Sequence, residues 1–504
     1  MNPTSRPVVF AVALVVLLLL AFRFIDHTVD DAFISFRYAD NLVSGHGFVF
    51  NPGERVEGYT NFLWCLLIAP FIAMSIDPEL AARGLGLVAS AALLAGVVRF
   101  SPKPESAPEI VWVAPLLTAV SPAIAVWASG GMEAPLFACL VVWSAGLAAR
   151  GLSQDRLHPG AALFAAAAAL TRPEGLGLFA VLAVLLLALR RGRPNGARDF
   201  ARWCGLFGIL FVPYFAWRWT YYGDLLPNTF YAKVGFNGAQ VVRGLEYYGS
   251  FLAESGWWLL LPLIGLVWSR DKSSVVLFGG LFAALGTYVA LVGGDGLPMY
   301  RFLVPVLPLW FLLIAYAVAG LVARFRPGRS LRALGAVLVL ALCARSAVPA
   351  FAGPAYRYVE QDRWEVSAWK EMGRYLATSP DPNASVAVIA AGALPYFSGL
   401  PAIDMLGLND RTIAHREMPH LGTGQAGHEK YDVDYVLDRE PTYVFIGAYG
   451  MSAQPRPAQE LIHPFYGAET EMLRSARFRG SYRLVRAQTA GGYFAFFVRT
   501  ADAE

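Results

Sequence analysis

Twelve apolar runs fill most of the first 350 residues, and they constrain the fold of this chain more than any other feature. About 20 apolar residues are enough to cross the hydrocarbon core of a bilayer. Charged residues make up 15% of the 504 residues, whereas an ordinary soluble domain carries about a quarter. The sequence therefore predicts a polytopic α-helical membrane protein and excludes a disordered chain, a collagen, a coiled coil and a small disulfide scaffold. The runs lie near residues 8–22, 62–76, 80–98, 108–127, 134–149, 160–171, 176–189, 203–219, 257–268, 275–292, 302–322 and 333–349.

Basic residues between the runs predict the orientation. The loops 190–202 and 324–332 are rich in arginine, and Arg270 with Lys272 marks a third basic loop. Such loops stay in the cytoplasm. The first run is not followed by a small-residue cleavage site, so we expect it to remain as a span. With the N-terminus inside and the tail outside, the number of crossings must be odd. About eleven spans are predicted, with one short pair (62–76 and 80–98, or 160–171 and 176–189) failing to cross fully.

The chain divides into two predicted domains. Residues 1–350 form the membrane domain, and residues 351–504, which are richer in charge, form a soluble domain of ordinary size on the far side of the membrane. An amphipathic pattern predicts a helix over residues 364–377. Alternating apolar residues predict strands within 385–391, 442–446, 482–485 and 493–498. We therefore expect a C-terminal α/β domain outside the cytoplasm.

Cysteine, histidine and net charge add little to this picture. All four cysteines lie in apolar runs and lack zinc-ligand spacing, so we expect no disulfide and no structural metal from them. The histidines of the tail also lack metal-ligand spacing. The net charge of +4 comes from short loops rather than a basic stripe with aromatic residues, which argues against a nucleic-acid partner.

Two adjacent acids follow the first apolar run. Asp30 and Asp31 begin a segment in which Ile34, Tyr38 and Leu42 recur every four residues, and this spacing predicts a short amphipathic helix lying on the membrane face. One aspartate could serve as a helix cap. Two carboxylates near a bilayer are costly unless they are paired or used. The pair is therefore a candidate for chemistry.

The arginines of the same loop have an ordinary explanation as well. Arg37 and Arg55 could equally pair with Glu54 or Glu57, which lie in the same segment.

The string DDAFISFRYADNLVSGHGFVFNPGERVEGYTNFLW, residues 30–64, resembles one branch of the GT-C glycosyltransferase superfamily. That branch contains bacterial arabinofuranosyltransferases that finish cell-wall arabinan or decorate pilin. Further segments resemble the same branch: SGGMEAPLF at 129–137, LTRPEG at 170–175, GDLLPNTFYAK at 223–233, GGDGLPMYRFLVPVLP at 293–308, IDMLGLND at 403–410 and GHEK at 427–430. The resemblance is discontinuous but reaches from the first loop into the tail.

This resemblance implies an activity and a location. The family takes a sugar from a polyprenyl-phosphate lipid, so the donor here would carry arabinofuranose or a similar pentose, and the acceptor would be a glycan or a protein. The enzyme would be a multi-pass protein of the bacterial plasma membrane with its active site facing the periplasm. The carboxylates could also hold a divalent cation, although no metal ligand set is identified.

Glycosyl transfer needs a base for the acceptor hydroxyl and cations for the departing phosphate. Asp30 and Asp31 are the candidate bases in an inverting reaction, and Glu133 is a second acid that could orient the acceptor or a cation. A simpler role for Glu133 is to begin a helix at the interface.

For the phosphate we favour Arg301, Lys233 and Arg172, because cations at the end of a span lie at headgroup depth. Arg301 could instead be an interfacial anchor, and Arg172 could pair with Glu174. The remaining candidates for the donor or acceptor pocket are Arg37, Glu57, Tyr59, Asn228, Asp295, Tyr300, Asp404 and His428.

Two other functions remain open at this stage. A transporter or flippase of a lipid-linked glycan would usually show internal repeats and charges near the bilayer centre, and this sequence shows neither. A non-catalytic subunit of cell-envelope assembly could also bind sugar through its tail, although it would have no need of the Asp30–Asp31 pair.

Overall fold

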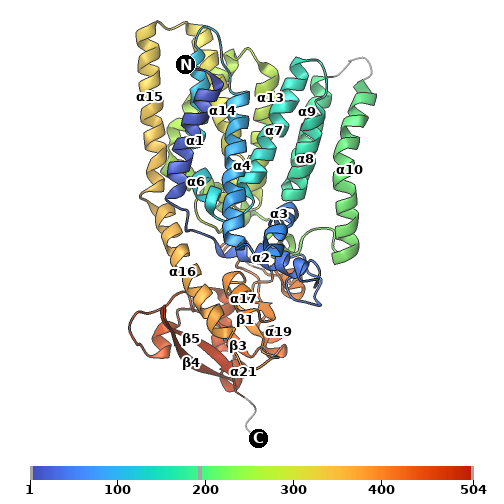
Figure 1. Ribbon diagram of the computed structural model, residues 1–504, viewed down its shortest axis with the longest axis vertical. Helices are drawn as coiled ribbons and strands as arrows, with labels where there is room; N and C mark the ends of the chain where they lie inside the picture. Colours follow the sequence, from blue (N-terminus) through green and yellow to red (C-terminus); the bar gives the residue numbers. More distant parts are fainter. Residues whose placement is uncertain (1–3, 191–195, 420, 501–504) are drawn as a thin grey trace.

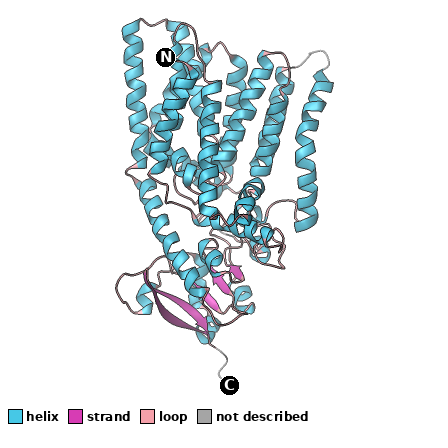
Figure 2. Ribbon diagram, viewed as in Figure 1, coloured by secondary structure: helices cyan, strands magenta, loops and turns pink. Residues whose placement is uncertain are grey.

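The computed structural model describes residues 4–190, 196–419 and 421–500. It consists of a bundle of long helices and a smaller tail that carries a β-sheet (Figures 1 and 2). The N-terminus lies at the end of the bundle farthest from the tail. A layer of short helices and loops lies between the two parts, and this layer is where the acids of the first loop are found.

The bundle contains helices that follow the predicted apolar runs. By length and composition, six helices of the described chain could cross a membrane, and a bent pair could add a seventh. The long helices are α4 (Pro78–Phe100), α7 (Ala134–Ser153), α10 (Gly196–Tyr222), α13 (Lys272–Leu291), α14 (Leu307–Phe325) and α15 (Arg329–Ala347). Shorter apolar helices are α1 (Arg6–Phe22), α3 (Phe62–Ala73), α8 (Pro159–Thr171) and α9 (Glu174–Leu189). The predicted number of eleven spans stays a prediction.

Two of the apolar runs are not simple α-helices. The run near 108–127 is divided into η1 (Pro108–Trp112), α5 (Val113–Ala119) and α6 (Pro122–Ser129), with a bend of 55° before Pro122. Proline lacks a backbone N–H and cannot continue the preceding helix, which explains the break. The run near 257–268 forms a 3₁₀ helix, η2 (Trp257–Trp268), which packs on α14.

The predicted helix after the first span is present as α2 (Asp30–Val43), but its surroundings differ from the prediction. Both of its faces are buried between the bundle and the tail, so it is not a surface helix. Phe33, for example, has no exposed surface and packs against Tyr396 and Phe397 of α17 (Ala393–Ser398). The layer also contains α11 (Asn228–Lys233), α12 (Gly238–Ser255) and η3 (Arg301–Leu303).

The tail has the mixed α/β structure that its sequence predicts. Its sheet has the strand order β2-β1-β3-β5-β4, in which β1 pairs in parallel with β2 and β3, and β5 is antiparallel to β3 and β4. The strands are β1 (Val386–Val388), β2 (Ala402–Asp404), β3 (Tyr443–Phe445), β4 (Tyr482–Thr489) and β5 (Gly492–Arg499). The prediction missed β2, which is only three residues long.

Helices complete the tail. The predicted helix over 364–377 is the second half of α16 (Pro354–Leu376). This helix follows the bundle after the short η4 (Val348–Ala350) and leads to the sheet. The other helices are short: α18 (Arg411–His415), α19 (Val433–Asp438), η5 (Ala458–Leu461), α20 (Gly467–Arg474) and α21 (Ala476–Ser481).

Arg37 joins the first loop to the tail. Its guanidinium donates hydrogen bonds to the backbone carbonyls of Phe50 (2.7 Å), Pro395 (2.6 Å) and Leu400 (2.7 Å). Arg37 therefore does not pair with Glu54 or Glu57, because the tail supplies carbonyl acceptors that the sequence could not place. Arg55 does not pair with them either, as its contact below shows.

The other charged residues of this loop also have distant partners. Glu54 pairs with Arg439 of the tail, and Arg55 lies over the ring of Tyr221. Glu57 pairs with Arg218 at 2.7 Å. These contacts fix the first loop against α10 and the tail rather than against itself.

Replacing Arg37 should loosen the tail. We expect Arg37→Gln to lower the free energy of unfolding by about 3 kcal/mol, because buried carbonyl oxygens lose charged donors. Arg55→Gln is the matched control in the same loop, and it should cost no more than about 1 kcal/mol because Arg55 is exposed and makes a cation–π contact. Thermal unfolding in detergent and protease sensitivity of the tail would measure both. Equal effects of the two variants would contradict this account.

Candidate active site

Two connected cavities lie between the bundle and the tail. The narrow one, about 140 Å³, faces the bundle, and the wide one, about 810 Å³, extends into the tail. Four charged side chains line both: Asp31, Lys233, Arg243 and Asp295. The wide cavity has the size of an ordinary small-ligand site. The junction of the two cavities is therefore the candidate active site.

The two adjacent acids of α2 have different surroundings. Both carboxylate oxygens of Asp30 accept backbone N–H groups of the tail, from Gly392 at 2.9 Å and Ala393 at 2.7 Å. Burial raises the pKa of Asp30 to about 7, although these hydrogen bonds act in the opposite direction. The side chain of Asp31 is 25% exposed and lines both cavities. Asp30 thus fastens the tail to α2, while Asp31 faces the junction.

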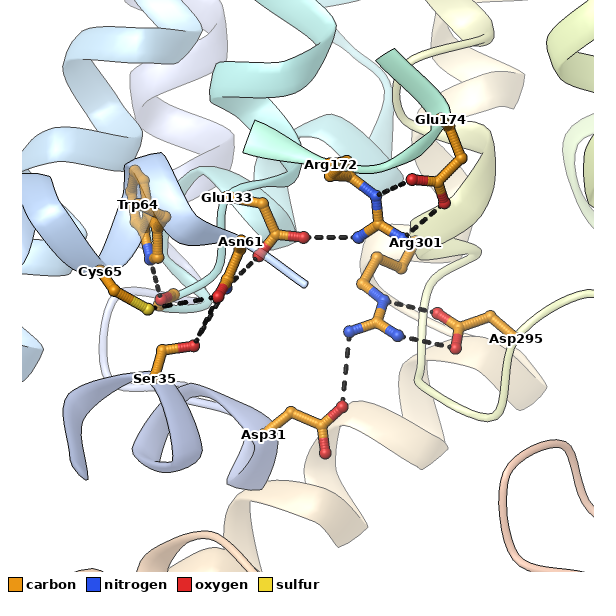
Figure 3. Close-up of polar contacts among 11 residues, drawn as sticks. Asp31, Ser35, Asn61, Trp64, Cys65, Glu133, Arg172, Glu174, Asp295 and Arg301 are labelled. Carbon is orange, nitrogen blue, oxygen red and sulfur yellow. Dashed lines mark hydrogen bonds and ion pairs between the residues drawn. The ribbon is translucent and has the colours of Figure 1, made fainter. Parts of the chain in front are cut away.

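Arg301 connects its own turn, which contains Asp295, to Asp31 of α2 at this junction (Figure 3). Its guanidinium donates to both carboxylate oxygens of Asp295, at 2.7 and 2.9 Å, and lies 3.5 Å from Asp31. Burial lowers the pKa of Arg301, but the charges of Asp295 and then Asp31 outweigh it and raise the pKa overall. Tyr300, with φ of 54°, turns the backbone immediately before it. The arginine is held charged and fully inside the protein.

A second charged group lies beside the first. Glu133 has no exposed surface and accepts hydrogen bonds from Arg172 and from Asn61, the latter at 2.7 Å. Arg172 also pairs with Glu174 at 2.9 Å, as the sequence suggested. Figure 3 shows that this group and the Arg301 group lie next to each other. Glu133 therefore orients Arg172 rather than only beginning a helix.

The ring of Phe302 contacts both guanidinium groups. Those of Arg172 and Arg301 each lie 5.2 Å from the centroid of this ring. Two like charges can remain close because each has its own carboxylate partner and both contact the aromatic ring.

Lys233 and His428 complete the junction. Lys233 lines both cavities, and a Cβ atom on Gly427, whose φ is +83°, would approach its Cε to 2.9 Å. His428 lines the wide cavity and stacks on Tyr466 with ring centroids 4.6 Å apart. Burial lowers the pKa of His428, so the ring is neutral near pH 7. Glycine at 427 lets the tail approach the lysine closely.

Five further predicted site residues lie in other environments. Asp404 caps a turn by accepting the N–H groups of Leu406 and Asn409. The side chain of Asn228 donates to carbonyls of the tail, and Tyr300 packs on Tyr247 and Phe251. Arg37 and Glu57 make the contacts described above. In the structure these five residues support the layer. The other predicted tyrosine, Tyr59, lines the narrow cavity, whereas Tyr300 lines neither the narrow nor the wide one.

Sequence reasoning missed Arg243. Its Nε donates to the carbonyl of Gly293 at 3.0 Å, and its Nη1 pairs with Glu429 at 3.0 Å. It thereby links the turn before Asp295 to the tail. The residue is on the amphipathic helix α12, where an arginine looks like an ordinary solvated residue, so the sequence gives no signal for it.

A metal ion finds no ready ligand set here. Within residues 4–190, 196–419 and 421–500, no group of three histidine, cysteine, aspartate or glutamate residues could hold one. Asp31 and Asp295 already form ion pairs with Arg301, and Glu133 forms one with Arg172. We therefore assign no chemical step to a divalent cation.

Comparisons with known proteins agree with this architecture. A protein-family model, described as a domain of unknown function (DUF8728), matches residues 355–497. Two curated relatives are both named terminal beta-(1->2)-arabinofuranosyltransferase. The one from Mycobacterium tuberculosis is 32% identical over 46% of this chain and 39% of its own length, and the one from Corynebacterium glutamicum is 29% identical over 55% and 47%. The chain spans less than half the length of these relatives.

Solved structures show the same fold. ArnT from Cupriavidus metallidurans, bound to undecaprenyl phosphate, superimposes with a TM-score of 0.57 over 80% of this chain and 86% of its own, at 14% identity. The mycobacterial arabinofuranosyltransferase AftD has a TM-score of 0.50 over 98% of this chain and 42% of its own, at 17% identity. The resemblance to GT-C glycosyltransferases is therefore confirmed. The chain has the helical fold of these structures, and six of its described helices are long and apolar enough to cross a membrane.

The raised pKa of Asp30 predicts how the melting temperature of the protein depends on pH. The pKa is about 7 in the folded protein against an ordinary value of 3.8. The stabilisation from protonated Asp30 is therefore complete below about pH 4 and is lost as the pH rises through 7. Asp30→Asn should flatten the fall in melting temperature between pH 5 and 8. Asp40→Asn, an exposed position on the same helix, is the control for loss of one carboxylate. If both variants keep the parent protein's dependence of melting temperature on pH, Asp30 does not titrate between pH 5 and 8.

Proposed function

We propose that this protein is an inverting glycosyltransferase that moves arabinofuranose from a polyprenyl-phosphate donor to a glycan outside the cytoplasm. The names of the sequence relatives support the sugar, and the ArnT structure with undecaprenyl phosphate supports the kind of donor. The observation that carries the proposal is the junction itself, where Asp31 lies beside Arg301 between two cavities of different character.

The narrow cavity suits the donor phosphate. Arg172 lines it from the bundle, and Arg301, Lys233 and Arg243 line it from the layer between bundle and tail, so these four cations exceed by one the three acids on the same wall, Asp31, Glu174 and Asp295. A guanidinium binds phosphate oxygens through two parallel hydrogen bonds. As the glycosidic bond breaks, negative charge grows on the phosphate, and cations fixed in a site of low dielectric stabilise that charge more than water does.

The wide cavity suits an uncharged acceptor. The wall of the wide cavity contains four acids that are absent from the narrow one: Asp30, Glu246, Asp362 and Glu365. They outnumber the cations on the same wall, Lys233 and Arg243. The ionised fraction of these acids would repel an anionic acceptor, although burial raises the pKa of Asp30 and of Glu365 to about 7. Aromatic rings from the tail also line this cavity, and one of them, Phe465, is 72% exposed. Aromatic faces with carboxylates at their edges offer a sugar both an apolar surface and hydrogen-bond acceptors.

The reaction then follows from the position of Asp31. Its carboxylate takes the proton of an acceptor hydroxyl in the wide cavity, and the oxygen forms a bond to the anomeric carbon of the donor. The bond from that carbon to the phosphate oxygen breaks on the opposite face, and the electron pair remains on the phosphate. Attack and departure on opposite faces invert the configuration. Asp30, whose oxygens are bound to the tail, positions the helix that carries Asp31.

The assay for this proposal measures polyprenyl phosphate released by purified protein from decaprenyl-phosphoryl arabinofuranose in the presence of an arabinan oligosaccharide. We expect Asp31→Asn to lower turnover by about 10²–10⁴-fold, because the base is lost. Asp40→Asn controls for loss of an acid from the same helix. A flippase or an assembly subunit would release no polyprenyl phosphate, and normal turnover by Asp31→Asn would falsify its role as the base.

Arg301 should act mainly in the transition state. We expect Arg301→Gln to lower turnover strongly while donor affinity falls less, since the charge on the phosphate develops as the bond breaks. Arg301→Lys should restore only part of the rate, because an ammonium lacks the planar fork. Turnover and donor binding measured on the same preparations would separate the two effects. Unchanged turnover in Arg301→Gln would mean that the residue is only structural, and Lys233 would be the next candidate.

A further inference from the structure

A third cavity lies at the other end of the bundle, far from the candidate active site. It has a volume of about 870 Å³. It is lined by the first residue of α1, the ends of α4, α7 and α14, the beginning of α15 and the segment between η2 and α13. In Figure 1 these ends lie at the N-terminal end of the bundle, and the tail is at the opposite end. The basic loops place this end on the predicted cytoplasmic side.

The charges around this cavity are almost all positive. Five cations at its wall make no ion pair with a carboxylate in the part of the chain that the structure describes: Arg99, Lys103, Arg150, Arg270 and Arg326. Cations are common on cytoplasmic loops, but that rule does not require them to converge on one concave site. Water and salt screen part of their mutual repulsion, since four of the five are exposed, and a bound anion would relieve the rest.

The other charged groups at the cavity leave this imbalance in place. Arg6 donates to the carbonyls of Val98 and Ser101, at 3.1 and 3.0 Å, so it keeps its charge without a carboxylate. Arg332 lies 3.3 Å from Glu109, and its buried Nε has no partner among the described residues. The one acid on the cavity wall, Asp271, accepts the N–H and the hydroxyl of Ser274. That carboxylate is occupied as the cap of α13.

Exposed apolar side chains flank the cations on the outside of the bundle. Phe325 is 64% exposed next to Arg326, and Leu331 is 61% exposed next to Arg332. Val267 of η2, near Arg270, is 68% exposed. A ligand that carries both a phosphate and hydrocarbon chains would contact both surfaces, whereas a free phosphate would use only the cations.

We propose that this cavity binds the phosphate headgroup of an anionic membrane lipid, whose acyl chains lie along η2 and α15. Basic pockets between helices on the cytoplasmic side are suited to such headgroups. The site is separate from the candidate active site and does not depend on the proposed function. It would fix this end of the bundle in the leaflet opposite the glycosyl donor.

The test titrates the full-length protein, in a neutral detergent, with short-chain phosphatidylglycerol, phosphatidylcholine of the same chains, and inorganic phosphate, and counts bound molecules by native mass spectrometry. We expect phosphatidylglycerol to bind most tightly. Arg99→Gln with Arg326→Gln should weaken it by about 30-fold, since each cation near a lipid phosphate contributes about 1 kcal/mol. The control is Arg202→Gln with Arg329→Gln, which removes two exposed arginines that do not line the cavity.

Each outcome decides the proposal. Selective binding of phosphatidylglycerol that is lost in the cavity variant and kept in the control variant supports it. Equal binding of the two lipids, or equal losses in the two variants, overturns it. Binding of inorganic phosphate as tight as that of phosphatidylglycerol identifies the site as one for free phosphate and overturns the lipid as its source. The cavity variant should melt no lower than the parent protein without lipid, because it relieves repulsion, so a folding defect would be recognised.

Discussion

Every charge buried at the candidate active site must have a partner, and the group formed by Arg301, Asp295 and Asp31 meets this requirement while joining α2 to the turn that contains Asp295 and Arg301. An uncompensated buried charge costs several kcal/mol, so these two segments are fixed relative to each other. Arg172 with Glu133 forms a second such group, and both guanidinium groups contact the ring of Phe302. Placing cations beside a candidate base in this way pre-organises a site in which charge will develop on a phosphate.

The tail forms one wall of this site rather than a separate module. Asp30 and Arg37 bind backbone groups of the tail, and Arg243 binds both the turn before Asp295 and Glu429. The contacts of Asp30 and Arg37 use backbone atoms of the tail, whereas the contact of Arg243 requires the side chain of Glu429. The wide cavity exists only because bundle and tail meet in this way.

The two ends of the bundle differ in charge for different physical reasons. At the tail end, cations and acids alternate, and the acids increase toward the tail, so that a phosphate and an uncharged acceptor find different surroundings. At the opposite end, cations gather with one occupied acid. Paired charge is suited to chemistry in a buried site, whereas unpaired positive charge at a membrane surface is suited to holding an anion.

The sequence by itself determined the helical class with apolar helices and most strands of the tail, because hydropathy and periodicity are short-range properties. It also predicted a site around the Asp30–Asp31 segment and Arg301, and that role stays a prediction. Only the tertiary structure decided which acid faces the cavities, that α2 is buried on both faces, and that Arg37 and Asp404 support the fold. For Asp30 and Arg37 the outcome depends on contacts across more than 300 residues, such as Asp30 with Gly392 and Arg37 with Pro395. Spacing along the chain carries no information about such distant partners.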